Sequence, residues 1–343
     1  MLKMKPKKVL VLGATGAMGK YLVPELAAKG YSVDAVSLDE YDFGCQVNLI
    51  KAQAKDFDFR TELLKNRYDG IVDFLTYPTS ELVLFLPELL ESTEHYIYLS
   101  SYRVYDGSDV PITEKSPRLA DNSSDIMFRN SDDYAIYKAR GENILRSWKR
   151  KNWTIVRPAI TYSLLRYQLV TLEAGTTVAR AKLGKTVVLP ETARNIHATL
   201  SWAGDVSKMI AELLFNEKAL GETFTTSTSE HHTWGEIAEY YKDICNLNAI
   251  WVDQTDFLKI AVTGFERFPY TGSWQLVYDR LFNRIIDNSK VLAATGMQEK
   301  NMMKLYDGLK YEIGRCPDNF FNEAMKISAN IRMDEYLKAK GRV

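Results

Sequence analysis

Short apolar runs alternate with amphipathic stretches through the first half of the chain. Runs rich in Val, Ile and Tyr, bounded by Gly, Pro or polar residues, are typical of buried strands. Apolar residues recurring at three and four positions are typical of helices that cover a sheet. The pattern predicts strands at 8–12, 32–38, 70–76, 95–101 and 154–159, and helices at 17–29, 59–67, 80–92 and 132–151.

Alternating strands and helices of this length predict an α/β fold. Right-handed crossovers then build a parallel sheet with helices on both faces, a doubly wound arrangement. The second half of the chain is less regular. It predicts helices at 205–216 and 233–247, a strand at 223–227, a loop at 264–273, and a mostly helical tail at 299–340.

A glycine-rich segment joins the first predicted strand to the first helix. Gly13, Gly16 and Gly19 are spaced GxxGxxG, the context of a phosphate-binding turn. Gly13 would make the tight turn, Gly16 would let backbone approach a pyrophosphate, and Gly19 would let the helix pack on the sheet. The exposed N–H groups and the helix end would face the phosphates. The turn predicts a dinucleotide held by Gly13, Thr15, Gly16, Ala17, Met18 and Gly19.

The end of the second strand indicates which dinucleotide. Folds of this type place an acid there to bind the adenosine ribose, and here the chain offers Ser37 and Asp39. The acidic surroundings lack an Arg or Lys for a 2′-phosphate, which favours NAD over NADP. Asp56, before Phe57, lies where a loop after the third strand would bond the adenine amine, and a solvated loop carboxylate is the alternative.

A tyrosine and a lysine four residues apart suggest proton transfer. Tyr134 and Lys138 would share one face of the helix at 132–151. A phenol titrates near pH 10, and a nearby ammonium and a cationic nicotinamide would lower that pKa. Ser101, at the end of the preceding strand, would orient the substrate oxygen.

The same spacing occurs at Tyr306/Lys310 and Tyr336/Lys340. Those pairs fall in the helical tail and read as solvated faces, whereas Tyr134 follows the strand that bears Ser101, at the sheet edge where ligands bind. Tyr137 is the nearest competitor, but it projects about 100° away from Lys138 around the helix.

Together these residues resemble the extended branch of the short-chain dehydrogenase/reductase superfamily. That branch includes the NAD-dependent epimerases and dehydratases of sugar nucleotides. The resemblance covers roughly residues 7–300. It implies an NAD-binding Rossmann domain at 1–163, joined by 205–228, and a smaller C-terminal substrate domain at 164–204 and 229–343. The matching stretches are Gly13 to Gly19, Ser100-Ser101 to Val104-Tyr105, Tyr134 with Lys138, and Arg157-Pro158-Ala159.

The resemblance also implies residue roles. Tyr134 would be the catalytic acid/base, Lys138 would bind the nicotinamide ribose, and Ser101 would orient the substrate. Pro158 would lie beside the cofactor. The residues predicted to bind substrate are Arg103, Arg194 and Arg280, each of which also fits a surface cation.

One departure from the family narrows the reaction. The 4,6-dehydratases carry an Asp-Glu pair after the hydroxyl residue, and here those positions are Tyr102-Arg103. The sequence therefore predicts an NAD-dependent oxidoreductase or epimerase acting on a sugar nucleotide or similar polyol. The alternative is a nucleotide-sensing or RNA-associated protein on the same fold, without turnover. Retention of Ser101, Tyr134 and Lys138 argues against that alternative.

Composition bounds the partners and the compartment. The 343 residues hold 44 Lys+Arg and 44 Asp+Glu, and zero net charge argues against a nucleic-acid partner. Four histidines without ligand spacing predict no metal site, and no apolar run reaches membrane-spanning length. Three scattered cysteines suit a reducing, cytoplasmic compartment. Helices 80–92 and 132–151 would form a homodimer interface, as is common in the family.

Overall fold

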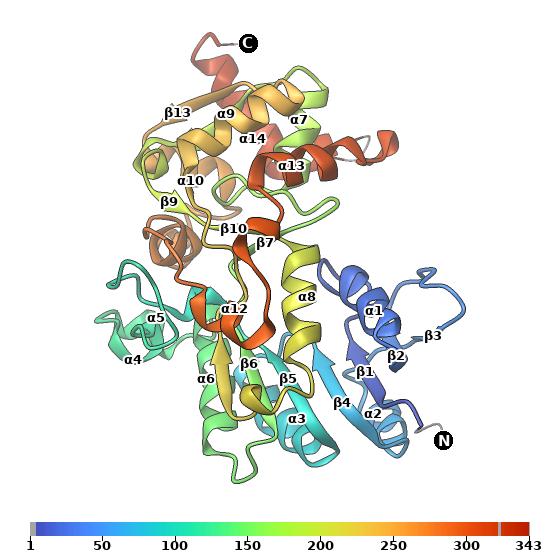
Figure 1. Cartoon of the computed structure of the whole chain (residues 1–343). Coiled ribbons are helices and arrows are strands. Elements are labelled where there is room, and N and C mark those ends of the chain that lie inside the picture. The colour runs from blue at the N-terminus through green and yellow to red at the C-terminus, as the bar shows by residue number, and fades with distance from the viewer. Residues whose placement is uncertain (1–4, 322–323, 343) are drawn as a thin grey trace.

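Six strands from the first half of the chain and one from the second half form a seven-stranded parallel sheet. The computed structural model describes residues 5–321 and 324–342 (Figure 1). The strand order is β11-β6-β5-β4-β1-β2-β3, with every neighbouring pair parallel. The strands are β1 (Lys8–Leu12), β2 (Ser32–Ser37), β3 (Val47–Lys51), β4 (Tyr68–Asp73), β5 (Thr93–Leu99), β6 (Trp153–Val156) and β11 (Glu222–Phe224).

Helices cover both faces of this sheet. Because side chains alternate along a strand, Val9 and Val11 of β1 face one helical layer, and Leu10 and Leu12 face the other. One layer contains α1 (Gly19–Ala28) and α8 (Ala203–Leu213); the other contains α2 (Phe57–Leu64), α3 (Thr79–Glu91) and α6 (Tyr134–Ser147). This confirms the predicted doubly wound α/β fold.

Several predicted boundaries move because of capping. Asp56 accepts a hydrogen bond from the backbone N of Phe59, so α2 begins at Phe57, earlier than predicted. Asp133 accepts from the N of Ala135, so α6 begins at Tyr134. The strand predicted at 154–159 ends at Val156 and a separate β7 (Ile160–Tyr162) follows. The loop between β5 and α6 also contains two short helices, α4 (Leu119–Asn122) and α5 (Ile126–Asn130).

The second half adds short strands and a group of helices. In Figure 1 α7, α9, α10, α13 and α14 gather at the end of the molecule away from the large sheet. The pairs of short strands are β7 with β10, β9 with β12, and β8 with β13. The remaining elements are β8 (Val187–Pro190), β9 (His197–Ala198), β10 (Leu200–Trp202), β12 (His232–Thr233), β13 (Ala249–Val252), α7 (Val178–Lys182), α9 (Trp234–Cys245), α10 (Gln254–Ala261), α11 (Pro269–Gly272), α12 (Ser289–Thr295), α13 (Leu305–Gly314) and α14 (Ser328–Ala339).

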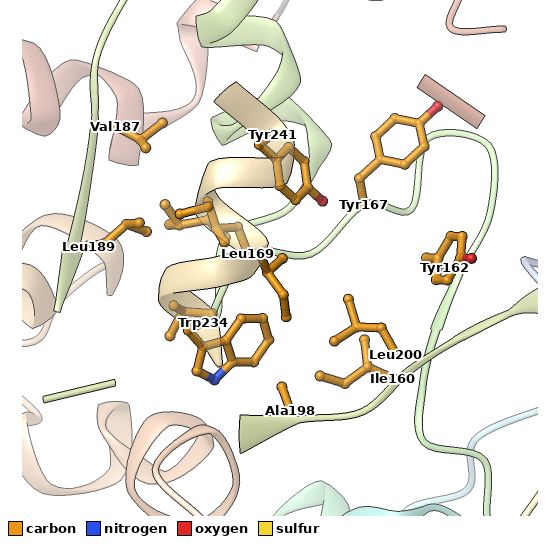
Figure 2. Packing of buried hydrophobic residues seen from close by; sticks show 14 of the residues in the cluster. Ile160, Tyr162, Tyr167, Leu169, Val187, Leu189, Ala198, Leu200, Trp234 and Tyr241 are labelled. Atoms are coloured by element: carbon orange, nitrogen blue, oxygen red, sulfur yellow. The ribbon is translucent and has the colours of Figure 1, made fainter. Parts of the chain in front are cut away.

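A separate apolar core stabilises this half. Trp234 and Tyr241 project from α9 toward Leu169, in the loop after β7, and toward Leu200 of β10 (Figure 2). All four side chains are almost fully buried. The core is consistent with a substrate domain, although the predicted domain boundaries stay a prediction.

Polar contacts hold the second half above the carboxyl ends of the strands. The carboxylate of Glu312, on α13, accepts hydrogen bonds from Tyr21 on α1 and from Trp202 Nε1. Its backbone carbonyl accepts from the Tyr167 hydroxyl at 2.7 Å. These contacts fix α13 against the helix that follows the glycine-rich turn. In the described part of the chain, no helix combines the length and apolar character that crossing a bilayer requires.

Candidate active site

The glycine-rich turn leaves β1 in a conformation that needs glycine. Gly13 has φ +77°, the left-handed region, and its N donates to Val36 O at 3.0 Å. At Gly16 a Cβ would lie 3.2 Å from Gly13 O, a tight but bearable contact. At Gly19 a Cβ would overlap the backbone of Ala14. Gly19 therefore serves close packing within the turn itself, rather than against the sheet as predicted.

A cavity of about 290 Å³ lies on one side of this turn. Thr15 Oγ1 hydrogen-bonds to Ser37 Oγ and contacts Asp39 Oδ2 at 3.2 Å. The structure thus brings together the residues predicted for the adenosine end. No Lys or Arg is among the described residues that line this cavity. The lining residues are Gly13, Thr15, Gly16, Val36, Ser37, Leu38, Asp39, Ala52, Gln53, Ala54, Phe74 and Leu75.

Asp56 and Phe57 are not part of this wall. The Asp56 carboxylate caps α2, accepting from Phe59 N at 2.8 Å, and Phe57 is 66% exposed. The loop-carboxylate alternative fits this position. Gln53 and Ala54 line the cavity instead. They lie just beyond β3, a half-buried strand with only a weak hydrophobic pattern. The sequence therefore did not show where this strand ends, and the adenine contact was placed too far along the chain.

A second cavity of about 280 Å³ lies on the other side of the turn. It is formed at the carboxyl ends of β1, β5 and β6, with the loop after β7 opposite. Ala17 and Met18 of the turn face Ser101, Tyr134 and Pro158 here. The remaining lining residues are Leu99, Ser100, Tyr102, Arg103, Ala159, Ile160, Thr161, Arg166, Gln168, Glu173, Gln275 and Arg280.

The two adjacent serines after β5 have different partners. Ser100 Oγ donates to the buried carboxylate of Glu142 at 2.6 Å. Ser101 Oγ accepts from Arg103 N at 3.2 Å and hydrogen-bonds with Tyr134. Ser101 is therefore the hydroxyl beside the phenol, as predicted.

Burial raises the pKa of Tyr134 above its usual value, and the neighbouring groups oppose that shift. The Arg103 guanidinium lowers the pKa most, followed by the hydrogen bond with Ser101 and the charge of Arg166. The guanidinium carbon of Arg103 lies 5.2 Å from the centre of the Tyr134 ring. The Tyr137 ring stands edge-on to Tyr134, outside the cavity wall.

Lys138 lies beneath the two cavities. Its fully buried Nζ donates to Leu99 O at 2.6 Å and Leu75 O at 3.3 Å. Leu99 lines the second cavity and Leu75 lines the first. The ammonium is 5.7 Å from the centre of the Tyr134 ring. Burial lowers the pKa of Lys138 to about 8, with partial compensation by the charge of Asp73.

The two alternative Tyr–Lys pairs lie elsewhere. Tyr306 donates to Asp243, and Tyr336 donates to Asp256 at 3.0 Å, both on the C-terminal half. Neither tyrosine lines either cavity.

The three predicted substrate arginines fall into two groups. Arg103 and Arg280 line the second cavity. Arg194 does not; it is exposed, with Glu191 at 3.6 Å and the Trp251 ring nearby. Gln168, Glu173 and Gln275 also line the cavity and were not predicted, because they come from irregular loops and a π-helical turn without a motif.

These two cavities fit a dinucleotide that crosses the glycine-rich turn. Ser37 and Asp39, predicted for the adenosine end, line the first cavity, and Ser101, Tyr134 and Pro158 line the second. Three other residues predicted to bind the cofactor line neither cavity: Asp56, Phe57 and Lys138. Within the described residues, no group of three or more His, Cys, Asp or Glu side chains could hold a metal ion.

A family model described as the NAD dependent epimerase/dehydratase family matches residues 9–216, more than half of the 343 residues. The chain belongs to this family. Membership confirms the family predicted from the sequence, and the NAD dependence in the family description agrees with the predicted cofactor.

One curated relative of this chain is named for binding nucleic acid and not for an epimerase or dehydratase activity. It is the chloroplast stem-loop binding protein of 41 kDa b of Arabidopsis thaliana, 28% identical over 249 residues. The alignment covers 68% of this chain and 62% of the relative. The chain therefore spans less than two thirds of that relative's length.

Solved structures of epimerases share the fold. An epimerase of Methanothermobacter thermautotrophicus has a TM-score of 0.70 at 14% identity, covering 94% of this chain and 95% of its own. The UDP-glucose 4-epimerase of Thermus thermophilus, solved with NAD, has a TM-score of 0.64 at 18% identity, covering 90% and 98%. At these identities the likeness establishes the architecture alone.

Proposed function

We propose that this chain is an NAD-dependent oxidoreductase or epimerase of a sugar nucleotide or similar polyol. The observation that carries the proposal is one cavity in which Ser101 and Tyr134 face Ala17 and Met18 of the glycine-rich turn. A hydroxyl pair for proton transfer thus lies beside the turn that would hold the cofactor. A sugar nucleotide as substrate is supported by the family resemblance seen in the sequence and by the name of the Thermus thermophilus structure, a UDP-glucose 4-epimerase.

Bound NAD supplies a hydride acceptor for the carbinol carbon of the substrate. Tyr134 takes the proton of the same hydroxyl, so that a ketone forms as the C–H and O–H bonds break. Ser101 holds the substrate oxygen beside the phenol. Arg103 and Arg166 favour the phenolate, which opposes part of the rise in the Tyr134 pKa caused by burial. An epimerase would re-form the C–H bond on the other face of the same carbon, with Tyr134 returning the proton to the oxygen. A dehydrogenase would release the ketone.

The residues that would hold NAD have separate tasks. Thr15, Ser37 and Asp39 would bind the adenosine ribose, and the N–H groups of the turn would bind the pyrophosphate. Lys138 would offer its remaining N–H to the nicotinamide ribose, between Leu75 and Leu99.

Absorbance near the reduced-nicotinamide band tests this proposal. NAD-loaded protein should gain absorbance when a turned-over nucleotide sugar is added, transiently for an epimerase and steadily for a dehydrogenase. Chromatography of the sugar then separates the two. A protein that binds NAD but neither reduces it nor alters any nucleotide sugar would contradict an enzymatic role.

A stem-loop nucleic acid is the second candidate ligand, favoured by the name of the Arabidopsis thaliana relative. The exposed run Lys149-Arg150-Lys151, after α6, is where a phosphate backbone would find three adjacent cations. Replacing all three by Gln should abolish a gel shift with a stem-loop oligonucleotide and leave NAD binding intact. Binding that the triple substitution does not change would reject this surface.

A further inference from the structure

Three arginines line the cavity that holds Ser101 and Tyr134, and one carboxylate, Glu173, accompanies them. Arg280 is already committed to the protein. It donates to Val170 O and Gln168 Oε1, both at 2.7 Å, and to Tyr102 Oη at 2.8 Å, and it pairs with the buried Asp279. Arg280 therefore shapes the wall and has little capacity left for a ligand.

Arg103 is held less completely. Its side chain is 13% exposed, and its ion pairs with Asp133 and Asp279 are both long, at 3.5 Å. Its Nε is buried and has no hydrogen-bond partner. Asp279 already pairs with Arg280 and Arg284, so one carboxylate serves three guanidinium groups. A buried cationic donor of this kind gains from an additional anionic acceptor.

Arg103 stands next to the reacting groups. Its backbone N bonds to Ser101 Oγ, and its guanidinium lies over the Tyr134 ring. Arg166 lies on the facing loop with its side chain 57% exposed, and its ion pair with Glu173 is long, at 3.9 Å. Both arginines lower the pKa of Tyr134, so both charges act at the same place. An anion bound there would lie adjacent to the carbon whose hydroxyl meets Tyr134.

We propose that Arg103, assisted by Arg166, binds a carboxylate on the substrate beside the carbon that is oxidised. The substrate class is then an acidic sugar nucleotide rather than a neutral one, an inference that rests on the proposed function. A planar guanidinium matches a carboxylate with two parallel hydrogen bonds, which gives both affinity and orientation. The alternative is that Arg103 binds the substrate diphosphate. Acidic and neutral sugar nucleotides share that group, so Arg103 would then not discriminate between them.

Calorimetry with NAD-loaded protein compares UDP-glucuronate with UDP-glucose, which differ only in a carboxylate for a hydroxymethyl group. We expect the wild type to bind UDP-glucuronate at least about tenfold more tightly. Arg103→Gln should lose that preference and keep its affinity for UDP-glucose. Arg267→Gln, which removes an exposed arginine that does not line the cavity, should keep the preference.

Equal affinities in the wild type, or a preference that survives Arg103→Gln, would overturn the proposal. Equal weakening of both ligands would assign Arg103 to the diphosphate instead. If Arg103→Gln does not fold, Arg166→Gln must reduce the preference and Arg103→Lys must retain part of it.

A second pair of probes separates this inference from the proposed function. Free glucuronate and free glucose are compared by thermal shift at tens of millimolar on the same variants. If neither UDP-sugar binds but glucuronate stabilises the wild type and not Arg103→Gln, the nucleotide part of the proposed function fails and the carboxylate site stands. If no pair shows an Arg103-dependent difference, the carboxylate site is wrong.

Discussion

At the scale of single residues, the two tyrosines at the start of α6 have different surroundings. Tyr134 faces Ser101 in the cavity, and Tyr137 does not line it. Tyr134→Phe should lower kcat by about 10²–10⁴-fold, the usual contribution of a general acid–base group, and leave NAD affinity unchanged. Tyr137→Phe is the matched control and should retain turnover. Steady-state kinetics under saturating NAD decide between them; a dead Tyr137→Phe would reverse the assignment.

The proposed contact of Lys138 with the nicotinamide ribose would make cofactor binding sensitive to pH. Its pKa is lowered to about 8 by burial, so the ammonium is present below that pH and is lost as pH rises through it. We expect NAD affinity to weaken between about pH 7 and pH 9. Lys138→Met should bind NAD weakly at all these pH values, because the ammonium is absent throughout. Calorimetric titrations at pH 7, 8 and 9 test this; an affinity of the wild type that is flat with pH would exclude the lysine from the ribose site.

At the scale of elements, substitutions at two glycines of the turn should have different effects, one on NAD binding and the other on stability. Gly16→Val places branched carbons where a pyrophosphate would approach, and its Cβ meets Gly13 O at a bearable 3.2 Å. The variant should fold and lose NAD binding. Gly19→Ala should instead lower the melting temperature, because its Cβ overlaps the Ala14 backbone. Thermal unfolding with and without NAD distinguishes the two; a folded Gly16→Val with unchanged affinity would reject the phosphate site.

A buried ion pair fastens α6 to β6. Glu142 Oε2 receives Arg157 Nη2 at 2.5 Å and Arg118 Nη1 at 3.0 Å, and its Oε1 receives Ser100 Oγ. Glu142→Gln leaves the Arg157 charge buried and should cost about 3–5 kcal/mol of unfolding free energy.

The same pair predicts a dependence on acid. Burial raises the pKa of Glu142, but Arg157 and its other partners more than reverse this and bring it to about 2, against 4.5 for an ordinary Glu. Its stabilisation is therefore complete above pH 4.5 and is lost as pH falls toward 2. Urea titrations at pH 7, 4 and 3 should show a smaller loss for Glu142→Gln than for the wild type. Equal losses would show that other groups set the acid limit.

The sequence predicted the parts of the fold and the site that lie within one continuous stretch of chain. The triple-glycine turn, the strand that leads to Ser101 and the helix carrying Tyr134 each have a continuous signature. Gln53 escaped prediction because β3 is a half-buried edge strand with weak alternation. The bonding of Arg280 within the protein was not predicted either, because its partners, Tyr102 and the loop at 168–170, are brought to it only by the fold.

At the scale of the whole molecule, the predicted homodimer can be tested on α3. Leu82, Phe85 and Leu86, three apolar residues of this helix, are buried in the chain's own core. Val83 and Leu84 are the exposed apolar residues of this helix, at 63% and 66%. If the predicted homodimer forms here, Leu84→Glu should convert it to a monomer in sedimentation at micromolar concentration. Val110→Glu, which changes another exposed apolar residue, should not. A monomeric wild type would end the proposal.

The position of β11 in the sheet has a consequence for synthesis. β6 pairs on one side with β5 and on the other with β11, but residues 157–221 must be made before β11 exists. At ribosomal rates this interval lasts about 3 to 13 seconds. Throughout it, the nascent chain presents β6 as an unpaired edge, the kind of surface that other chains join. The newly made protein is therefore exposed to aggregation midway through translation, when six of the seven strands have been made and the last is still missing.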